Sequence, residues 1–270
     1  MKDIKLIVCD VDGTLLSAQN ELSEQVAHTI RNYVSGGGLF TVATGRPQLT
    51  ARRIVRQLSL TAPYILCNGS VIAQGDRLLA RDTIGLEELA PMLEEADRRG
   101  LTVLLFEDER VRTLRRTAEV EAFEAKERVA CELVDAAEDW RSGRVLKVIL
   151  IGDLVLASTL WEPVTGMLGG RYDAVQSEHH YLEIIPGGHS KGKALARVLE
   201  ELELEPGQVM AIGNQLNDLD MLEHAGIGVA VGNSHPLLKD QADYVCSGSY
   251  GEGVVEAIST FCSITEQKEG

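Results

Sequence analysis

The chain has 270 residues, of which 44% are hydrophobic and 25% charged, and its formal net charge is -15. These values are typical of a soluble globular protein with one large domain or two smaller ones. The negative charge argues against a nucleic-acid or anionic-membrane partner, because both need basic patches. The five cysteines have no metal-type spacing, and no membrane span or signal-peptide pattern is visible, so we expect a cytoplasmic protein with reduced thiols.

The first third of the chain alternates predicted strands and helices. Short apolar runs predict strands at residues 6–9, 39–43 and 64–67. Apolar positions with helical spacing predict two helices between them, one on Val26, Ile30 and Val34 with Ser23 as its N-cap, the other on Ile54, Val55 and Leu58. This order is typical of a parallel, doubly wound sheet.

The pattern changes from residue 71. Residues 71–73 and 77–79, separated by a Gly-Asp turn, predict a hairpin, which a purely parallel sheet does not contain. Further helices and strands are expected at residues 86–96, 101–106, 119–126, 145–151, 154–168, 172–177 and 181–185. Such mixed elements indicate a separate α+β lobe, which we place at residues 83–186, inserted between the two halves of the first domain at 1–82 and 187–270.

The doubly wound pattern then resumes. We expect helices from about residue 191, around Met221 and Leu222, and at 254–261, and strands at 209–212 and 227–231, with a frayed polar end at 265–270. The expected fold class is α/β, a doubly wound parallel-sheet (Rossmann-like) core with an inserted α+β cap domain.

Two carboxylates, Asp10 and Asp12, follow the first predicted strand. Ligands of open α/β sheets bind outside the carboxyl ends of the strands, and a buried carboxylate is rare unless it is used. Asp10 could attack a phosphorus atom, Asp12 could act as general acid and base, and an oxygen-rich pair suits Mg²⁺. An Asp-Gly turn with solvated acids is the alternative interpretation.

Three more polar stretches follow in chain order: Thr44-Gly45-Arg46, Ser190-Lys191-Gly192, and Gly213-Asn214-Gln215-Leu216-Asn217-Asp218. The first and third come directly after predicted strands, and the second opens a predicted helix, where a lysine opposes the macrodipole and indicates an anionic partner. The alternatives are an ordinary strand-turn junction, an exposed solubilising lysine, and a helix N-cap at Asn214.

A known family has these four stretches in this order. Asp10-Val11-Asp12-Gly13-Thr14-Leu15 resembles the first motif of the haloacid dehalogenase-like phosphatases, and the other three stretches stand where that family has its remaining motifs. The inserted lobe, with Thr-Gly-Arg-Pro and Cys-Asn-Gly-Ser before it, is similar to the large α/β cap of the Cof-type branch. Three further stretches fit that branch: Leu182-Glu183-Ile184, Gly232-Asn233-Ser234 and Gly251-Glu252-Gly253-Val254.

The resemblance implies a role for each matching acid and amide. Asp10 would be the nucleophile and Asp12 the general acid/base, and both would bind Mg²⁺, Asp12 through its backbone carbonyl. Asp218 would lie in the outer shell of the metal and orient its water. The family usually has an aspartate as the third protein ligand of the metal where this chain has Asn214, so we expect weaker Mg²⁺ binding.

The resemblance also implies a phosphate pocket. Thr44, Lys191 and Asn217 would hold the phosphoryl group, helped by the backbone of Val11 and Gly45. Their expected substrate is a small phosphorylated metabolite, hydrolysed through an aspartyl-phosphate by a monomer or homodimer. A sugar phosphomutase-type phosphotransferase and a non-catalytic sensor of phosphorylated metabolites are the alternatives.

Residues outside these motifs have more ordinary interpretations. Arg46 and Asn68, at the root of the cap, are candidate substrate contacts. Trp140 and Trp161 are expected to pack inside the lobe or to serve as surface anchors. His179, His180 and Tyr181 could face the substrate, but an ordinary strand edge is the favoured interpretation. The basic cluster at residues 110–116 is expected to be a solvated face.

Overall fold

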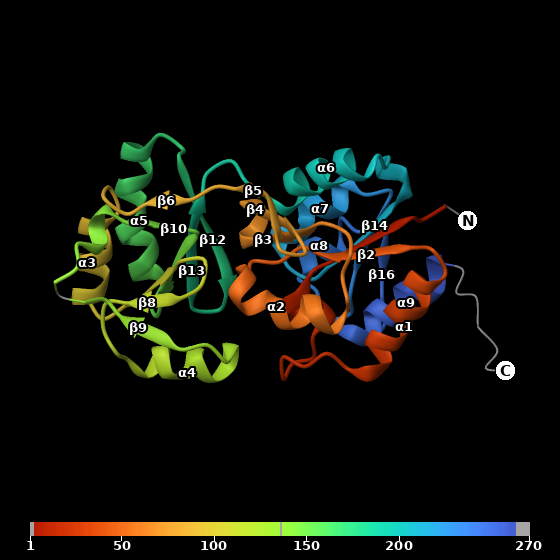
Figure 1. Cartoon of the computed structure of the whole chain (residues 1–270), viewed down its shortest axis with the longest axis horizontal. Coiled ribbons are helices and arrows are strands. Elements are labelled where there is room, and N and C mark those ends of the chain that lie inside the picture. The colour runs from red at the N-terminus through yellow and green to blue at the C-terminus, as the bar shows by residue number, and fades with distance from the viewer. Residues whose placement is uncertain (1–2, 136, 263–270) are drawn as a thin grey trace. The chain divides into compact units, whose positions relative to one another are not determined.

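The computed structural model describes residues 3–135 and 137–262, which form two compact units. The first unit consists of Met1–Thr44, Arg52–Ala80 and Ser190–Gly270, and the second of Gly45–Ala51 and Arg81–His189. Each unit combines a sheet with helices, which confirms the predicted α/β class (Figure 1). The predicted domain limits at residues 82–83 and 186–187 stay a proposal, and the predicted frayed end at 265–270 lies outside the described residues.

A parallel sheet forms the centre of the first unit. Its strand order is β16-β15-β14-β1-β2, and every neighbouring pair is parallel. The strands are β1 (Leu6–Cys9), β2 (Leu39–Val42), β14 (Val209–Gly213), β15 (Ile227–Ala230) and β16 (Tyr244–Val245). The chain leaves β1 toward β2 and later returns to pair β14 with the other edge of β1. The carboxyl ends of β1 and β14 therefore flank the point where the strand order reverses, which is the ligand-binding position of such sheets.

Helices cover both faces of this sheet (Figure 1). α1 (Glu24–Ser35) and α9 (Gly251–Phe261) pack together on one face, and α6 (Lys191–Leu202) and α7 (Leu219–His224) on the other. The short helix α8 (Pro236–Lys239) follows β15. The α1 helix begins as predicted, because the Ser23 hydroxyl accepts a hydrogen bond from the Val26 N–H at 3.3 Å. All four residues of β1 are buried, as their apolar run predicts.

The predicted hairpin is present in a three-stranded sheet of the order β3-β4-β5, with β3 (Tyr64–Leu66), β4 (Val71–Gln74) and β5 (Arg77–Arg81). β3 also lies beside the end of β2, since Ala43 and Ile65 form a parallel bridge. α2 (Gln48–Gln57) connects these strands in the chain. The strand predicted at residues 64–67 therefore lies parallel to the end of β2 on one side and pairs antiparallel with β4 on the other.

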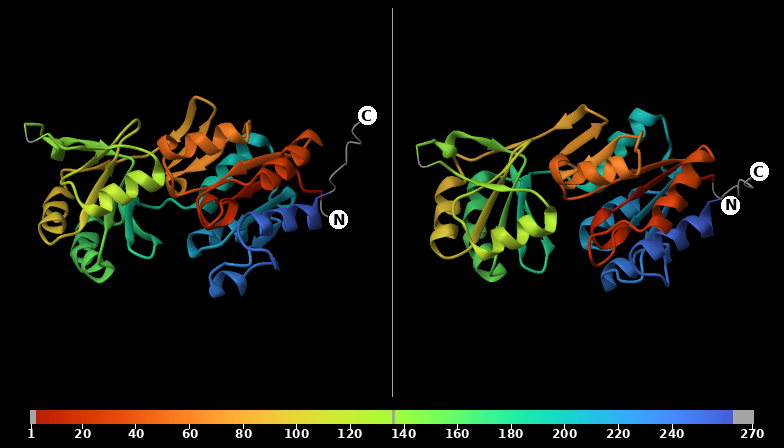
Figure 2. Two further views of the ribbon diagram at one scale, coloured as in Figure 1. Left: turned by 90° about the horizontal axis from the view of Figure 1, so that it is seen from below. Right: turned by 60° about the horizontal axis from the view of Figure 1, so that its bottom comes forward.

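The second unit has a six-stranded sheet in the order β12-β13-β11-β7-β8-β9, in which only the β8–β9 pair is parallel (Figure 2). Its strands are β7 (Thr102–Phe106), β8 (Val111–Thr113), β9 (Cys131–Leu133), β11 (Lys147–Ile151), β12 (Tyr172–Glu178) and β13 (Tyr181–Pro186), and β6 (Ile84–Gly85) pairs separately with β10 (Arg144–Val145).

Alternate residues of this sheet enter two apolar cores. α3 (Ala90–Arg98) and α5 (Leu154–Leu168) cover one face, together with Trp140 and Trp161, which confirms that both tryptophans pack inside the lobe. α4 (Ala118–Glu127) lies over the other face, where Phe123 meets Phe106 edge to face at 5.8 Å. His179 and His180 are exposed in the turn before β13, whereas Tyr181 is buried.

The prediction of a solvated face at residues 110–116 is wrong at Arg112. Its side chain is 5% exposed and forms ion pairs of 2.6 Å with Glu107 and 2.8 Å with Glu138. The reason is that Arg112 lies inside β8, a three-residue strand whose mixed polarity gives no strand pattern.

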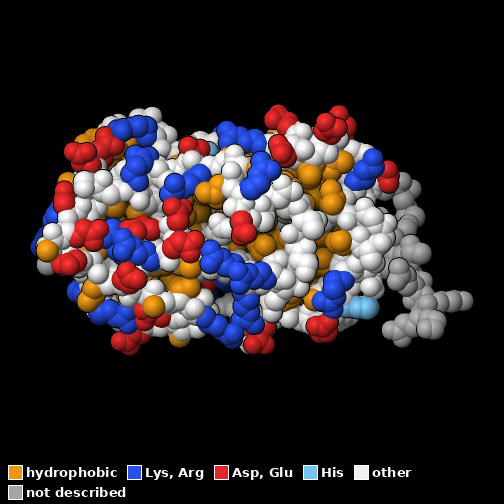
Figure 3. All heavy atoms as spheres, in the orientation of Figure 1, with side chains coloured by type: hydrophobic (Ala, Val, Ile, Leu, Met, Phe, Trp, Pro, Cys, Tyr) orange, Lys and Arg blue, Asp and Glu red, His pale blue; other side chains and the backbone are white. Residues whose placement is uncertain are grey.

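Acidic and basic side chains are interspersed over the face shown in Figure 3. Among the described residues, none of the helices has the length and apolar character needed to cross a bilayer.

Candidate active site

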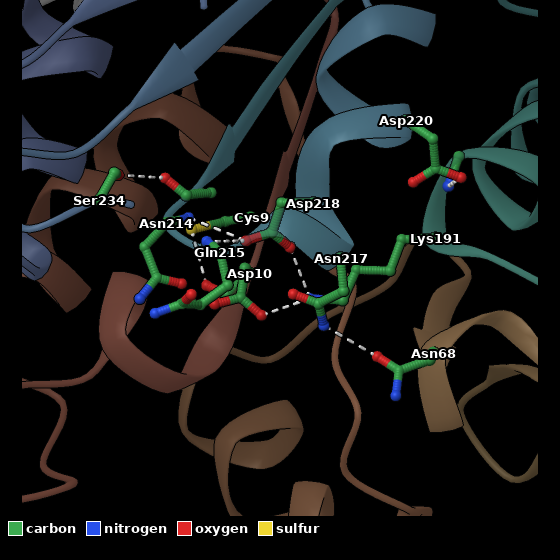
Figure 4. A network of polar contacts seen from close by, with 12 residues as sticks. Cys9, Asp10, Asn68, Lys191, Asn214, Gln215, Asn217, Asp218, Asp220 and Ser234 are labelled. Atoms are coloured by element: carbon green, nitrogen blue, oxygen red, sulfur yellow. Dashed lines mark hydrogen bonds and ion pairs between the residues drawn. The ribbon is translucent and has the colours of Figure 1, made fainter. Parts of the chain in front are cut away.

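Three polar loops follow neighbouring strands at the carboxyl edge of the parallel sheet. Asp10 follows β1, Thr44 follows β2 and Asn214 follows β14, and all three residues are buried. The Asp10 N–H donates to the Ile212 carbonyl at 2.8 Å, so the β1–β14 ladder continues up to Asp10. Figure 4 shows Asp10 and Asn214 among the residues of this polar network.

Lys191 joins two of the acids (Figure 4). Its Nζ donates to Asp10 Oδ1 at 2.6 Å and to Asp218 Oδ1 at 2.7 Å, and the residue is 1% exposed. Lys191 is the first residue of α6, whose N-cap Ser190 accepts from the Lys193 N–H. The cation at this helix start is therefore compensated by two carboxylates.

Burial changes the protonation chemistry of this pair. Burial raises the pKa of Asp10 to about 7; Lys191 opposes the shift, and the carboxylates of Asp218 and Asp12 add to it. Burial by itself lowers the pKa of Lys191, but the carboxylates of Asp10 and Asp218 outweigh it, so the pKa is raised and the lysine stays charged.

Asp218 holds the loop that follows β14. Its Oδ2 accepts hydrogen bonds from the backbone N–H groups of Asn214 at 2.8 Å and Gln215 at 2.9 Å. A side chain at Gly213 would lie 2.5 Å from the Asp218 Cβ, so only glycine allows this approach. Asp218 thus fixes both the Lys191 ammonium and the backbone of Asn214.

Two buried oxygens in this group have no hydrogen-bond partner among the residues that the structure describes: Oδ2 of Asp10 and Oδ1 of Asn214. Buried polar atoms normally have a partner, so these oxygens mark a place for a ligand. A carboxylate and an amide oxygen are ligands that Mg²⁺ accepts. Within the described residues, no group of three His, Cys, Asp or Glu side chains is placed to hold a metal, so a metal here needs the Asn214 amide and backbone oxygens as well.

Asp12 and Val11 lie in the turn Val11–Leu15, which is closed by a 3.0 Å hydrogen bond from the Leu16 N–H to the Val11 carbonyl. Gly13 has φ of +80° in this turn, a backbone conformation that glycine adopts without strain. Its missing side chain leaves space that the Asn214 amide fills. The glycine of the Asp-Gly pair is therefore required by the approach of the β14 loop.

Asn217 contacts Asn68, the amide predicted as a substrate contact. Its Nδ2 donates to Asn68 Oδ1 at 3.1 Å, while the Asn68 Nδ2 is buried without a partner (Figure 4). Cys67, Asn68 and Gly69 have φ of 49°, 53° and 102°, so three consecutive residues adopt left-handed conformations. Such strain persists only where surrounding structure imposes it, and here the Gly69 backbone packs against that of Ser190.

Gly45 and Arg46 belong to the second unit and contact residues of that unit. The Gly45 carbonyl accepts from Lys147 Nζ at 2.7 Å, and Arg46 pairs with Glu127 at 2.5 Å. Of the predicted site residues, the structure joins Asp10, Lys191, Asp218 and the Asn214 backbone in one network and Asn217 with Asn68 in another. Thr44 is buried beside β3, where its N–H donates to the Ile65 carbonyl at 2.9 Å.

Sequence reasoning missed two residues that hold these loops. Asp220 Oδ2 accepts from the Gly192 N–H at 3.0 Å, next to Lys191, and Asn233 Nδ2 donates to the Gly13 carbonyl at 2.8 Å. The Gly-Asn-Ser stretch around Asn233 was the only signal for it in the sequence, and Asp220 had none.

Comparison with known proteins gives a consistent family. Residues 7–258 match the family described as haloacid dehalogenase-like hydrolase. The chain is 28% identical to 5-amino-6-(5-phospho-D-ribitylamino)uracil phosphatase YcsE of Bacillus subtilis, over 95% of either protein. It is also 28% identical, over 93% of its residues, to the chloroplastic endoribonuclease YBEY of Arabidopsis thaliana, but spans only 45% of that protein.

A solved structure shows the same fold. A haloacid dehalogenase-like hydrolase from Bacteroides thetaiotaomicron superimposes with a TM-score of 0.85 at 27% identity, over 95% of this chain and 99% of that one. The family match covers nearly the whole chain and includes all four polar stretches at the sheet edge. The chain belongs to the haloacid dehalogenase-like hydrolases, in their Cof-type branch of phosphatases.

Proposed function

We propose that the protein is an Mg²⁺-dependent phosphatase that hydrolyses a small phosphorylated metabolite, such as a sugar phosphate, through an aspartyl-phosphate on Asp10. The observation that carries this proposal is the Asp10 carboxylate itself. One of its oxygens is held by the buried ammonium of Lys191 at 2.6 Å, and the other is buried without a partner. YcsE, a relative of similar length, is named for a phosphorylated ribityl compound, which supports the substrate class.

In the first step, an Asp10 oxygen attacks phosphorus while the bond from phosphorus to the leaving oxygen breaks. Asp12 gives its proton to that leaving oxygen, so the product departs as an alcohol. Lys191 favours the ionised form of the attacking carboxylate, because its charge opposes the burial that raises the pKa of Asp10.

In the second step, Asp12 takes a proton from water, and the water oxygen attacks phosphorus. The bond between phosphorus and the Asp10 oxygen breaks, which releases phosphate and restores the carboxylate. Throughout, Thr44, Lys191 and Asn217 would hold the phosphoryl oxygens with the backbone N–H group of Val11, so positioning and charge supply most of the rate.

The oxygens of Asp10 and Asn214 that lack partners would hold Mg²⁺ together with the Asp12 carbonyl, and Asp218 would orient its water. When bound, Mg²⁺ supplies positive charge that lets the Asp10 carboxylate approach the anionic substrate.

Asn68 is the stronger of the two candidate substrate contacts. Its Oδ1 is occupied by Asn217, which leaves the buried Nδ2 to donate to a substrate oxygen. Arg46 would have to exchange its 2.5 Å ion pair with Glu127 for a substrate anion.

The proposed function is tested by phosphate release from 4-nitrophenyl phosphate, with and without Mg²⁺, for the wild type and Asp10→Asn. We expect metal-dependent release that the substitution abolishes. A panel of metabolites then gives the substrate, and free phosphate rather than an isomerised sugar phosphate distinguishes hydrolysis from mutase chemistry. Binding of phosphorylated metabolites without any release at high Mg²⁺ would support a sensor instead, for which Asn214 is the specific reason.

A further inference from the structure

A side chain outside the four motifs holds the turn that carries the acid/base residue. Asn233, in the loop after β15, donates from Nδ2 to the Gly13 carbonyl at 2.8 Å. Gly13 directly follows Asp12, and both have backbone angles that do not fit a helix, φ -83° and ψ 116° for Asp12 and φ 80° and ψ 0° for Gly13. A turn with irregular angles depends on contacts from outside to keep its conformation.

The other end of the same amide is anchored to the start of α9. Asn233 Oδ1 accepts from the Tyr250 N–H at 2.8 Å. Tyr250 has φ 53° and ψ -140°, a conformation that side chains strongly disfavour, so this N–H is directed at Asn233 against a conformational cost. The amide supplies both the donor and the acceptor that this bridge needs, on two separate atoms.

The start of α9 is itself packed against the turn Val11–Leu15, which follows Asp10. A Cβ at Gly251 would lie 2.5 Å from Val26 Cγ2 and 3.2 Å from the Leu15 carbonyl oxygen, so glycine is required there. The preceding loop is held by Glu256, whose carboxylate accepts from the Ser247 and Gly248 N–H groups at 3.1 and 2.9 Å. The anchor of Asn233 is therefore itself held on two sides.

We propose that Asn233 is a positioning residue that sets the placement of Asp12 by bridging the Gly13 carbonyl to the start of α9. This inference rests on the proposed function, in which Asp12 protonates the leaving oxygen as its bond to phosphorus breaks. Asn233 acts on that proton transfer and leaves the phosphate-holding side chains of Thr44, Lys191 and Asn217 untouched.

The role has a kinetic signature that general damage to the protein lacks. Proton donation matters greatly for an alkyl leaving group, which departs badly as an alkoxide, and little for 4-nitrophenolate, which is stable as an anion. Misplacing Asp12 therefore lowers kcat/KM for glycerol 2-phosphate more than for 4-nitrophenyl phosphate. The ratio of the two values does not depend on how much of a variant is folded, because the same molecules turn over both substrates.

The experiment measures this ratio for the wild type, Asn233→Asp and Asn233→Ala at saturating Mg²⁺. The aspartate keeps the acceptor for Tyr250 but turns the donor facing Gly13 into a repelling oxygen, and the alanine removes both contacts. We expect the ratio of kcat/KM, alkyl over aryl, to fall by about tenfold or more in both variants, since general acid catalysis is worth on the order of 10²–10⁴-fold.

Tyr250→Gly is the matched control. It keeps the backbone N–H and removes the side chain from its disfavoured conformation, so the ratio should stay at the wild-type value. An unchanged ratio in the Asn233 variants, whether activity falls equally on both substrates or not at all, overturns the inference. Absence of phosphate release by the wild type would instead overturn the proposed function and this inference with it.

Discussion

At the scale of single residues, the site is a balance between buried charges. Lys191 lies 2.6 Å from Asp10 and 2.7 Å from Asp218, and Asn214 adds an uncharged oxygen where a further carboxylate would fit. Each buried charge is costly unless it is compensated, so changing one alters the affinity of the others for cations and protons.

Replacing Asn214 with aspartate adds a negative charge beside Asp10. We expect Asn214→Asp to bind Mg²⁺ about tenfold or more tightly, which corresponds to about 1.4 kcal/mol. Calorimetric titration with Mg²⁺ measures the two dissociation constants directly. Asn214→Ser is the control, because it removes the amide without adding charge and should bind no more tightly than the wild type. Equal dissociation constants for the wild type and Asn214→Asp would show that Asn214 does not contact the metal.

The raised pKa of Asp10 predicts a pH dependence of metal binding. With a pKa of about 7 in the metal-free protein, Asp10 is protonated below that pH and must lose its proton to bind Mg²⁺. The dissociation constant of Mg²⁺ should therefore fall roughly tenfold for each pH unit gained below pH 7 and level off above it. Titrations between pH 5.5 and 8.5 test this. A dissociation constant that does not change over this range contradicts the assignment of Asp10 as a ligand.

At the scale of single elements, the second unit contains a helix, α4, whose last turn is held by ion pairs and hydrogen bonds. Glu124 of α4 pairs with Arg116 at 2.7 Å and accepts from the Cys131 N–H at 2.6 Å, so one carboxylate joins α4 to β9. Hydrogen bonds from Arg116 and from the Cys131 backbone lower the pKa of Glu124 to about 2. A carboxyl group whose pKa is lowered in the folded protein stabilises the fold at pH values above its unfolded-state pKa. This stability is lost as the pH falls toward 2.

Glu124→Gln should accordingly destabilise the second unit at pH 7. The expected loss is only about 1 kcal/mol, because the side chain is partly exposed and solvent screens the ion pair. The difference from the wild type should shrink as the pH falls from 4.5 toward 2. Urea unfolding followed by tryptophan fluorescence measures it in the right place, because Trp140 and Trp161 are both in this unit and are the only tryptophans of the chain. A difference that is constant with pH would mean that the charge of Glu124 has no part in the effect.

Elements with strong local signals could be predicted from the sequence, and short mixed ones could not. α5 was predicted at residues 154–168 and lies at Leu154–Leu168, because Asp153 caps its start and Gly169 ends it in a left-handed conformation. β8 and β9 have three residues each, and β9 contains two exposed ones, so neither run shows a strand pattern, and the parallel pairing of β8 with β9 joins residues 20 positions apart.

In the candidate site too, local patterns predict some residues, whereas contacts between distant parts of the chain could not be predicted. The four motifs fall at strand and helix ends that local patterns predict, so the sequence could place Asp10, Lys191 and Asn214 at one edge of the sheet. The Lys191–Asp218 pair and the Asn233 bridge join residues 27 and 220 positions apart, and no local pattern contains such contacts.

At the scale of the whole molecule, the net charge of -15 acts against an anionic substrate. A negatively charged protein repels a phosphate ester. Salt screens this repulsion beyond the Debye length, which is about 10 Å at 0.1 M ionic strength. We expect KM for a phosphate ester to fall by roughly twofold as ionic strength rises from 0.01 to 0.15 M at saturating Mg²⁺, the reverse of electrostatic attraction. Steady-state kinetics in sodium chloride measure this. A KM that rises with salt would show that local cations dominate the field at the site.

The covalent intermediate on Asp10 is the central claim, and trapping it is the most direct test. Enzyme quenched during turnover is treated with borohydride, which reduces an aspartyl-phosphate to homoserine, and the digested peptide containing residue 10 is weighed by mass spectrometry. We predict homoserine at position 10 in the presence of substrate and Mg²⁺, and none without substrate. Sustained phosphate release with an unmodified Asp10 would contradict the account, because hydrolysis would then proceed without the nucleophile that we assign.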